Sequence, residues 1–211
     1  MPTILCFGDS NTWGAVPATG DGRFGRDVRW PGVMARQLGE AYEVRENGLN
    51  GRTTTFDRLP RHWRSGRDLI VPAMEVCAPI EVVIVLLGTN DVSMPQLSVV
   101  DITRGAGELL TIIRSSWDFG PAPGVAPRPL LVAPHLVGPL DDIDEQLSPG
   151  ARERSVELVD TYRDLATRLR CDFFDLSTVV SASADDPWHW DAEGHTLAGE
   201  ALSEKVRTML A

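Results

Sequence analysis

The feature of the sequence that most restricts the fold is the regular alternation of short apolar segments with longer amphipathic ones. The strongest apolar run, Val82–Leu87, is rich in β-branched residues, which predicts a strand buried on both faces of a sheet. Further strands are predicted at Thr3–Phe7, Tyr42–Glu46, Leu130–Ala133 and Cys171–Asp175. Helices are predicted at Pro31–Leu38, Asp101–Ser116, Pro149–Leu169 and Ala192–Leu210.

Strands that alternate with helices build parallel sheets with helices on both faces. The sequence therefore predicts an α/β protein, a flavodoxin-like three-layer α/β/α sandwich whose central five-stranded parallel sheet has the order 2-1-3-4-5. The 211 residues, 43% of them hydrophobic, suit a single domain spanning residues 1–211. Asp118–Pro129, which is rich in proline, and His135–Gly150, which is acidic, are interpreted as loops.

The charge balance excludes several classes of partner. The chain has 30 Asp and Glu residues against 20 Lys and Arg residues, a formal net charge of -10. Such a surface repels phosphate groups, so we expect neither nucleic acid nor an anionic membrane as a partner. The only lysine, Lys205, follows Glu204, which excludes the Gly-Lys-Ser/Thr sequence of a P-loop nucleotide site.

The cellular compartment is inferred from the cysteines and the N-terminal segment. Cys6, Cys77 and Cys171 are odd in number and far apart, which is typical of reduced thiols. The N-terminal segment has neither a basic region nor a long apolar run, so we expect no signal peptide. The run Val82–Leu87 is far too short to cross a bilayer. These features predict a cytoplasmic protein.

Small, polar and titratable residues follow each predicted strand, at the edge of a parallel sheet where ligands bind. These segments are Gly8-Asp9-Ser10, Asn47–Arg52, Gly88–Asp91, Pro134-His135 and Asp186–His189. Serine becomes a nucleophile when a base accepts its proton. A carboxylate three residues before a histidine can accept the Nδ1–H group and leave Nε2 facing the serine. We therefore predict Ser10, His189 and Asp186 as catalytic residues.

Attack on an ester carbonyl creates an oxyanion that requires hydrogen-bond donors. The candidate donors are the backbone N–H groups of Ser10 and Gly51 and the side-chain amide of Asn90. Asp9 and Asp91 are interpreted as structural, because carboxylates beside turns commonly accept backbone N–H groups. Each block alone has a simpler explanation as a turn or helix cap; their common position at one sheet edge favours a joint function.

These blocks, in this order, resemble the four conserved blocks of the SGNH hydrolases, or GDSL esterases, whose naming residues would be Ser10, Gly51, Asn90 and His189. The segments ILCFGDSNTWG, DVRWPGV and GLNGRTT are similar to the arylesterase/acyltransferase branch, which has alanine at the position of Gly51. The resemblance implies the SGNH hydrolase fold, small ester substrates, acyl transfer to alcohols or peroxide as well as to water, and a homo-oligomer.

Other histidines and a glycine-rich segment have alternative interpretations. His195 is expected to pack or cap in the last helix; the alternative, that it is the base, is disfavoured because no carboxylate lies three residues before it. His135 ends a strand and could line the site, although a loop position is favoured, and His62 is expected to be solvated. The spacing of His189, Asp191 and His195 matches no usual ligand set, so no metal site is predicted. Gly20–Gly25 matches the dinucleotide-binding pattern GxGxxG, but it does not directly follow a strand, so we interpret it as a mobile surface loop.

Six tryptophans are many for this length. Trp13 and Trp188 flank the predicted catalytic residues in sequence and are expected to line an apolar substrate pocket. Trp30, Trp63 and Trp117 are expected in core or subunit packing.

Three hypotheses of function remain from the sequence. The favoured one is a serine esterase/acyltransferase that acts on small esters through an acyl-serine and needs no cofactor. The same residues could serve a carbohydrate deacetylase, a lysophospholipase or a thioesterase. A flavodoxin-like binding domain without catalysis is the alternative outside the enzymes.

Overall fold

The computed structural model describes residues 1–57 and 62–211, except for the side chains of residues 142 and 143. Five strands form one parallel sheet in the order β2-β1-β3-β4-β5, which confirms the predicted order. The strands are β1 (Thr3–Gly8), β2 (Glu43–Gly48), β3 (Val82–Leu86), β4 (Arg128–Ala133) and β5 (Asp172–Asp175). Every predicted strand is present, with its ends moved by at most two residues.

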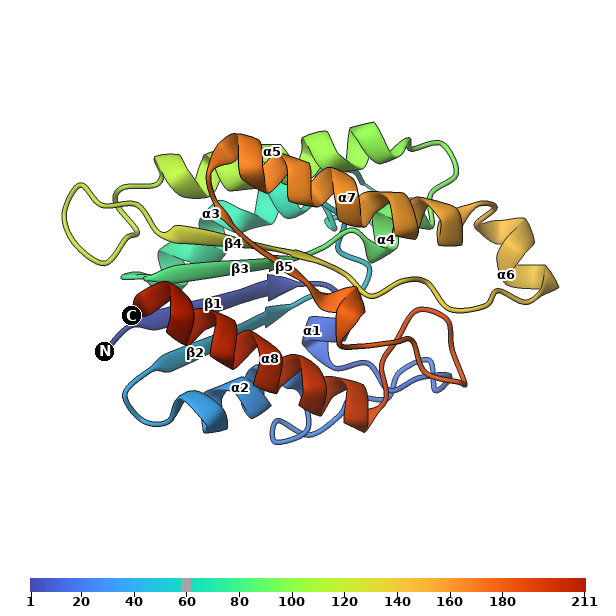
Figure 1. Cartoon of the computed structure of the whole chain (residues 1–211), viewed down its shortest axis with the longest axis horizontal. Helices are drawn as coiled ribbons and strands as arrows, with labels where there is room; N and C mark the ends of the chain where they lie inside the picture. The colour runs from blue at the N-terminus through green and yellow to red at the C-terminus, as the bar shows by residue number, and fades with distance from the viewer. Residues whose placement is uncertain (58–61) are drawn as a thin grey trace.

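Helices cover both faces of the sheet and make the predicted three layers (Figure 1). They are α1 (Ser10–Trp13), α2 (Trp30–Leu38), α3 (Gly66–Cys77), α4 (Thr89–Val92), α5 (Val99–Ser115), α6 (Asp142–Leu147), α7 (Ala151–Leu169) and α8 (Ala192–Leu210), with a 3-10 turn at Leu176–Thr178. In the view of Figure 1, α2 and α8 lie below the sheet, and α3, α5 and α7 lie above it.

The side chains of β1 alternate between two apolar cores. Leu5 and Phe7 pack in the core beneath α3, α5 and α7, whereas Ile4 and Cys6 pack in the core beneath α2 and α8. All four side chains are fully buried. A period of two with both faces apolar is the pattern of a central parallel strand.

Four helices in the part of the chain that the structure describes lie outside the predicted ones: the four-residue α1 and α4, and the longer α3 and α6. The segment His135–Gly150, interpreted as a loop, contains α6, so that interpretation was wrong in part. Helix α3 was not predicted, and it contains Pro72, a residue that removes a hydrogen bond from a helix interior. The interpretation of Asp118–Pro129 as a loop holds up to residue 127, because β4 begins at Arg128.

Within residues 1–57 and 62–211, no helix combines the length and the apolar composition that a bilayer-spanning segment requires.

Candidate active site

Helix α1 begins directly after β1 and presents Ser10 at the carboxyl edge of the sheet. The Asp9 carboxylate caps this helix by accepting the N–H of Asn11 at 3.0 Å. The turn can lie close to the neighbouring strand because Gly48 has no side chain. A Cβ atom on Gly48 would lie 2.1 Å from the backbone nitrogen of Trp13. The Asp9 cap and the close approach permitted by Gly48 therefore determine the position of Ser10.

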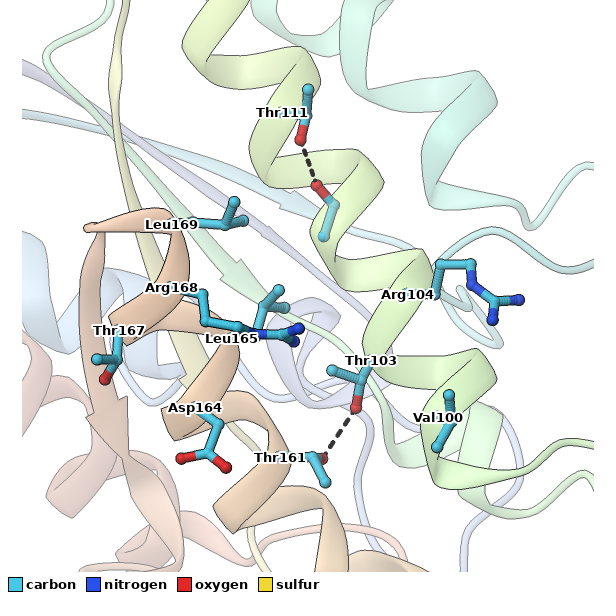
Figure 2. Close-up of a pocket in the computed structure, with 11 residues that line it drawn as sticks. Val100, Thr103, Arg104, Thr111, Thr161, Asp164, Leu165, Thr167, Arg168 and Leu169 are labelled. Carbon is cyan, nitrogen blue, oxygen red and sulfur yellow. Dashed lines mark hydrogen bonds between the residues drawn. The ribbon is translucent and has the colours of Figure 1, made fainter.

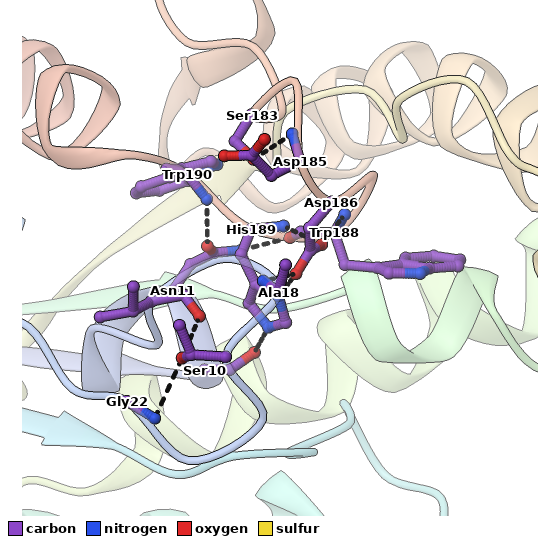
Figure 3. Close-up of polar contacts among 12 residues, drawn as sticks. Ser10, Asn11, Ala18, Gly22, Ser183, Asp185, Asp186, Trp188, His189 and Trp190 are labelled. Atoms are coloured by element: carbon purple, nitrogen blue, oxygen red, sulfur yellow. Dashed lines mark hydrogen bonds and ion pairs between the residues drawn. The ribbon is translucent and has the colours of Figure 1, made fainter.

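Three of the predicted catalytic side chains form one hydrogen-bonded row (Figure 3). Ser10 Oγ lies 3.0 Å from His189 Nε2, and His189 Nδ1 lies 2.6 Å from Asp186 Oδ2. The other carboxylate oxygen of Asp186 accepts the N–H groups of Trp188 at 2.7 Å and His189 at 3.0 Å. The row brings together two segments almost 180 residues apart in the chain, as the sequence predicted.

The hydrogen bonds to Asp186 keep its carboxylate ionised. Burial by itself raises the pKa of Asp186, but the hydrogen bonds and positive charge of His189, together with the N–H groups of Trp188 and Ala18, lower it to about 2. The carboxylate therefore remains negative at neutral pH and can accept a hydrogen bond from the Nδ1–H group of His189. This arrangement leaves Nε2 of His189 directed at the serine hydroxyl.

The residues of the three predicted oxyanion donors, Ser10, Gly51 and Asn90, line one pocket. Gly51 lies in the turn after β2 with φ 78°, and Asn90 lies in α4, directly after β3. The Asn90 amide donates a hydrogen bond to the carbonyl of Arg52 at 3.1 Å, which holds its orientation. Within the described residues, the backbone N–H groups of Ser10 and Gly51 donate to no protein acceptor. Both are available to a ligand.

A buried arginine, which sequence reasoning missed, ties these turns together. The guanidinium of Arg52, 4% exposed, donates to the carbonyls of Gly8 at 2.8 Å and Asn47 at 2.5 Å, and to the Asn47 side chain at 2.8 Å. It also lies over the ring of Phe7, 3.9 Å from the centroid. Burial lowers the pKa of Arg52 to about 10, and the charge of Asp9 opposes this shift.

Asp9 and Asp91 are fully buried beside the site and have the structural roles predicted for them. Asp91 accepts the N–H of Thr54 at 3.0 Å and the Thr54 hydroxyl at 2.6 Å. Burial raises the pKa of each carboxyl to about 6, although these hydrogen bonds lower it in part. Both groups brace the loops that carry the candidate donors.

A pocket of about 670 Å³ opens over Ser10 and His189. Trp13 and Trp188 line it, but so do polar side chains such as Asn50, Ser93 and Asp144, so the pocket is not the apolar one that was expected. The glycine-rich segment forms another wall through Gly20 and Gly22, and its exposed turns agree with a surface loop. Helix α6 contributes lining residues that the sequence analysis missed, because it treated that segment as a loop; they are Asp144 and Leu147.

The remaining histidines lie outside the hydrogen-bonded row. His195 is buried in α8, where its Nδ1 accepts the Trp30 N–H at 3.4 Å, in agreement with the predicted packing role. His135 follows β4 and is 1% exposed, so it is a core residue and not a typical loop histidine. Burial lowers the pKa of both imidazoles to about 4. His62 is exposed, as predicted.

The tryptophans expected in packing divide into two groups. Trp30 is fully buried in the core, as is Trp190 beside His189. Trp63 and Trp117 are 80% and 60% exposed, so neither belongs to the core of this chain.

Asp191 and His195, which lie near His189 in the sequence, have other partners in the fold. Asp191 accepts the N–H of Gly194 at 2.8 Å as the cap of α8, and His195 belongs to the core. Among the residues that the structure describes, no group of three potential ligand side chains converges on one point.

A larger hollow of about 940 Å³ lies between α5 and α7, away from Ser10 (Figure 2). Thr103 and Thr161 join the two helices across it through a hydrogen bond of 2.9 Å. Its lining holds hydroxyl, arginine and aspartate side chains but no histidine or cysteine. Without a nucleophile paired to a base, this hollow lacks the chemistry of the first pocket.

Comparisons with known proteins identify the family of the chain. The sequence model of the GDSL-like Lipase/Acylhydrolase family matches residues 6–197. The aryl esterase of M. smegmatis is 34% identical, with 99% of each chain covered and a TM-score of 0.93. Est24, a carbohydrate acetylesterase from Sinorhizobium meliloti, is 32% identical, with 99% of this chain and 100% of Est24 covered and a TM-score of 0.93. No curated protein sequence matches the chain significantly.

The family match spans most of the chain, and the two esterase structures align with nearly all of it. These matches argue against a non-catalytic binding domain. The chain therefore belongs to the GDSL-like lipase/acylhydrolase family, the SGNH hydrolases, and is an ester hydrolase.

Proposed function

We propose that this enzyme cleaves small carboxylic esters through an acyl-serine intermediate on Ser10. The observation that carries the proposal is the row from Ser10 Oγ to His189 Nε2 at 3.0 Å and from His189 Nδ1 to Asp186 at 2.6 Å. A serine hydroxyl within hydrogen-bond reach of an imidazole, which is itself oriented by a carboxylate, is the arrangement that nucleophilic acyl transfer requires.

The first half of the reaction forms the acyl-serine. Ser10 Oγ attacks the ester carbonyl carbon while His189 Nε2 accepts the hydroxyl proton. The carbonyl π electrons move to the oxygen and give a tetrahedral oxyanion. When the carbonyl re-forms, the bond to the alcohol oxygen breaks, and the leaving alkoxide takes the proton from His189. Asp186 stays ionised throughout and stabilises the imidazolium, in keeping with its pKa of about 2.

The second half repeats these steps with a new acceptor. Water or an alcohol gives its proton to His189 and attacks the acyl carbon, and the Ser10 oxygen leaves with that proton. Water yields the free acid, and an alcohol yields a new ester. Acyl transfer to alcohols or peroxide is therefore a property of the acceptor and uses the same residues.

The oxyanion is stabilised by the N–H groups of Ser10 and Gly51 and by the Asn90 side chain. The two backbone groups donate to no protein acceptor in the described chain, and the Arg52 carbonyl orients the Asn90 amide. Donors held in place before the reaction lower its barrier, and each is typically worth about 10²–10³-fold in rate.

The pocket supports small esters as substrates. Its volume of about 670 Å³ suits a small molecule, and Trp13 and Trp188 offer flat apolar surfaces for an aryl group. The second candidate substrate class is acetylated carbohydrate. Polar lining by Asn50, Ser93 and Asp144 and the likeness to a carbohydrate acetylesterase favour it.

Replacement of the nucleophile tests the mechanism. We expect Ser10→Ala to lower kcat for 4-nitrophenyl acetate by about 10³-fold or more and to abolish labelling by a fluorophosphonate. The matched control is Ser203→Ala, which removes a buried serine hydroxyl of α8 that donates to the Glu200 carbonyl. Retention of ester turnover by Ser10→Ala would disprove the assignment.

Competition between acceptors and substrates separates the finer alternatives. Phenyl acetate and an acetylated sugar are compared by kcat/KM, and an added alcohol is tested for formation of its acetyl ester. Preference for phenyl acetate with transfer to the alcohol supports the arylesterase/acyltransferase function. Preference for the sugar ester, or hydrolysis without transfer, supports the carbohydrate acetylesterase or a simple esterase.

A further inference from the structure

The residue after the proposed nucleophile makes an unusual pair of contacts. Asn11 is 1% exposed, and its side-chain amide faces the segment that carries His189 (Figure 3). Its Nδ2 donates to the carbonyl of Trp188 at 3.0 Å, and its Oδ1 accepts the N–H of Trp190 at 3.3 Å. One side chain thus holds the backbone on both sides of the histidine.

Most other backbone contacts around His189 lie within its own loop, and two tie the loop to other segments: the Gly138 N–H donates to the Pro187 carbonyl at 2.9 Å, and the Ala18 N–H donates to the Asp186 carboxylate at 3.3 Å. Asp186 accepts the N–H groups of Trp188 and His189, and the His189 carbonyl accepts the N–H of Ser183 at 2.8 Å. The bonds within the loop set the shape of residues 183–190, and those from Gly138 and Ala18 tie it to the segments after β4 and after α1. The two bonds to Asn11 tie the loop to α1 itself, because Asn11 belongs to the same short helix as Ser10.

We propose that Asn11 is a positioning residue that sets the distance between Ser10 Oγ and His189 Nε2. This inference rests on the proposed function, since it assigns Asn11 a role in proton transfer between those two atoms. Proton transfer requires hydrogen-bond geometry, and an error of about 1 Å in the position of a reacting group can lower a rate by about 10²-fold. Because Asn11 and Ser10 are adjacent in α1, the two hydrogen bonds of Asn11 position the His189 loop relative to the nucleophile itself.

The fourth position of the motif gives the proposal a specific form. The family name GDSL has leucine after the serine, whereas this chain has Asn11. Leucine branches at the same γ carbon, but it is larger and can neither donate to the Trp188 carbonyl nor accept the Trp190 N–H. Asn11→Leu would therefore give residues 8–11 the sequence Gly-Asp-Ser-Leu, and we expect this variant to be less active than wild type.

The test compares Asn11→Leu and Asn11→Ala with wild type in turnover of 4-nitrophenyl acetate. Active sites are counted by fluorophosphonate labelling, so that unfolded protein does not enter kcat. We expect both variants to lower kcat by about 10- to 100-fold, with KM within about threefold of wild type. The alanine variant separates loss of the hydrogen bonds from a steric effect of leucine.

The pH profile supplies a readout that general destabilisation would not produce. The Asp186–His189 bond lies within the loop and moves with it. The pH midpoint of kcat/KM should therefore stay within about 0.3 units of wild type while the plateau falls. A shifted midpoint would mean that the substitution disturbs the histidine–carboxylate pair itself and would overturn the proposed role.

The matched control is Thr12→Val, one residue further along α1. Thr12 is fully buried, and its Oγ1 accepts the indole N–H of Trp30 at 3.3 Å, so the control also removes a buried hydrogen bond from this helix. We expect a lower melting temperature but kcat within about twofold of wild type. An equal loss of kcat in Thr12→Val, or unchanged kcat in both Asn11 variants, would overturn the proposal. The proposed function is tested separately by Ser10→Ala.

Discussion

The two edges of the central sheet carry their charged side chains in opposite ways. At the carboxyl edge, Asp9, Asp91 and Arg52 are at most 4% exposed, and their partners are mainly backbone groups and hydroxyls. Toward the amino edge, charges form pairs at the surface, such as Arg45 with Glu43, whose side chains are 53% and 33% exposed. The first edge holds the candidate active site, and the second has no catalytic role in our proposal.

The contrast shows that this fold buries charged side chains mainly beside the candidate active site. A surface pair contributes little to stability because water screens it and long side chains resist ordering. A buried charge is costly unless hydrogen bonds compensate it, and once compensated it holds the neighbouring backbone firmly. Asp9 and Arg52 hold the turns that follow β1 and β2 in fixed positions by such hydrogen bonds. A site in which several hydrogen-bond donors converge requires turns held in this manner.

The largest expected effect contrasts the arginines of the two edges. Arg52→Met removes the donor of the Gly8 and Asn47 carbonyls, so we expect it to lower the free energy of unfolding by about 2–4 kcal/mol. We expect kcat to fall as well, because the turns carrying Ser10 and Gly51 lose a common brace. Urea unfolding and ester turnover measure the two effects.

The control for this comparison is Arg45→Met, at an exposed pair on β2. We expect it to change the free energy of unfolding by less than about 1 kcal/mol and to leave turnover unchanged. Equal losses of stability in the two variants would show that burial of Arg52 is not what distinguishes the edges.

A second prediction concerns pH. The pKa of Asp9 is about 6 in the folded chain, against about 3.9 in an unfolded one. Its ionisation therefore penalises the folded state, with the penalty absent below pH 4 and complete above pH 6, up to about 3 kcal/mol. Asp9→Asn still offers an oxygen to the Asn11 N–H. We expect this variant to be more stable than wild type at pH 8, with the advantage vanishing near pH 4.

The measurement is the difference in unfolding free energy between variant and wild type at pH 8, 6 and 4. Comparison with wild type is required because the titration of His135 and His195, with pKa values near 4, changes the free energy of unfolding in the opposite direction. Their contribution to stability is present above pH 6.5 and is lost as the pH falls toward 4. That contribution is common to both proteins and cancels in the difference. A pH-independent difference would contradict the raised pKa of Asp9.

The strands and the candidate catalytic residues could be predicted because each is marked by a short local pattern in the sequence. The five strands follow from apolar runs such as Val82–Leu87, and Ser10, Asp186 and His189 follow from residue types placed after strands. Helix α3 was missed because Pro72 argues against a helix interior.

The positioning contacts could not be predicted in the same way. Asn11 and Arg52 act on backbone groups, and any sequence supplies a carbonyl or an N–H, so no residue pattern marks the partner. The contact between Asn11 and the Trp188 carbonyl spans 177 positions and exists only once the sheet order is set. Sequence therefore points to candidate reacting groups more readily than to the residues that hold them.

The smallest expected effect lies within the site edge itself. Gly51 has φ 78°, a conformation that alanine adopts with strain, so Gly51→Ala should lower the free energy of unfolding by about 1 kcal/mol. The proposed oxyanion donor is the backbone N–H, which alanine retains, so kcat for 4-nitrophenyl acetate should stay within about fivefold of wild type. Asn90→Ala removes a side-chain donor and should lower kcat by about 10²-fold. If Gly51→Ala instead matched Asn90→Ala, the backbone of residue 51 would have moved, and the turn would owe its geometry to glycine more than to the Arg52 brace.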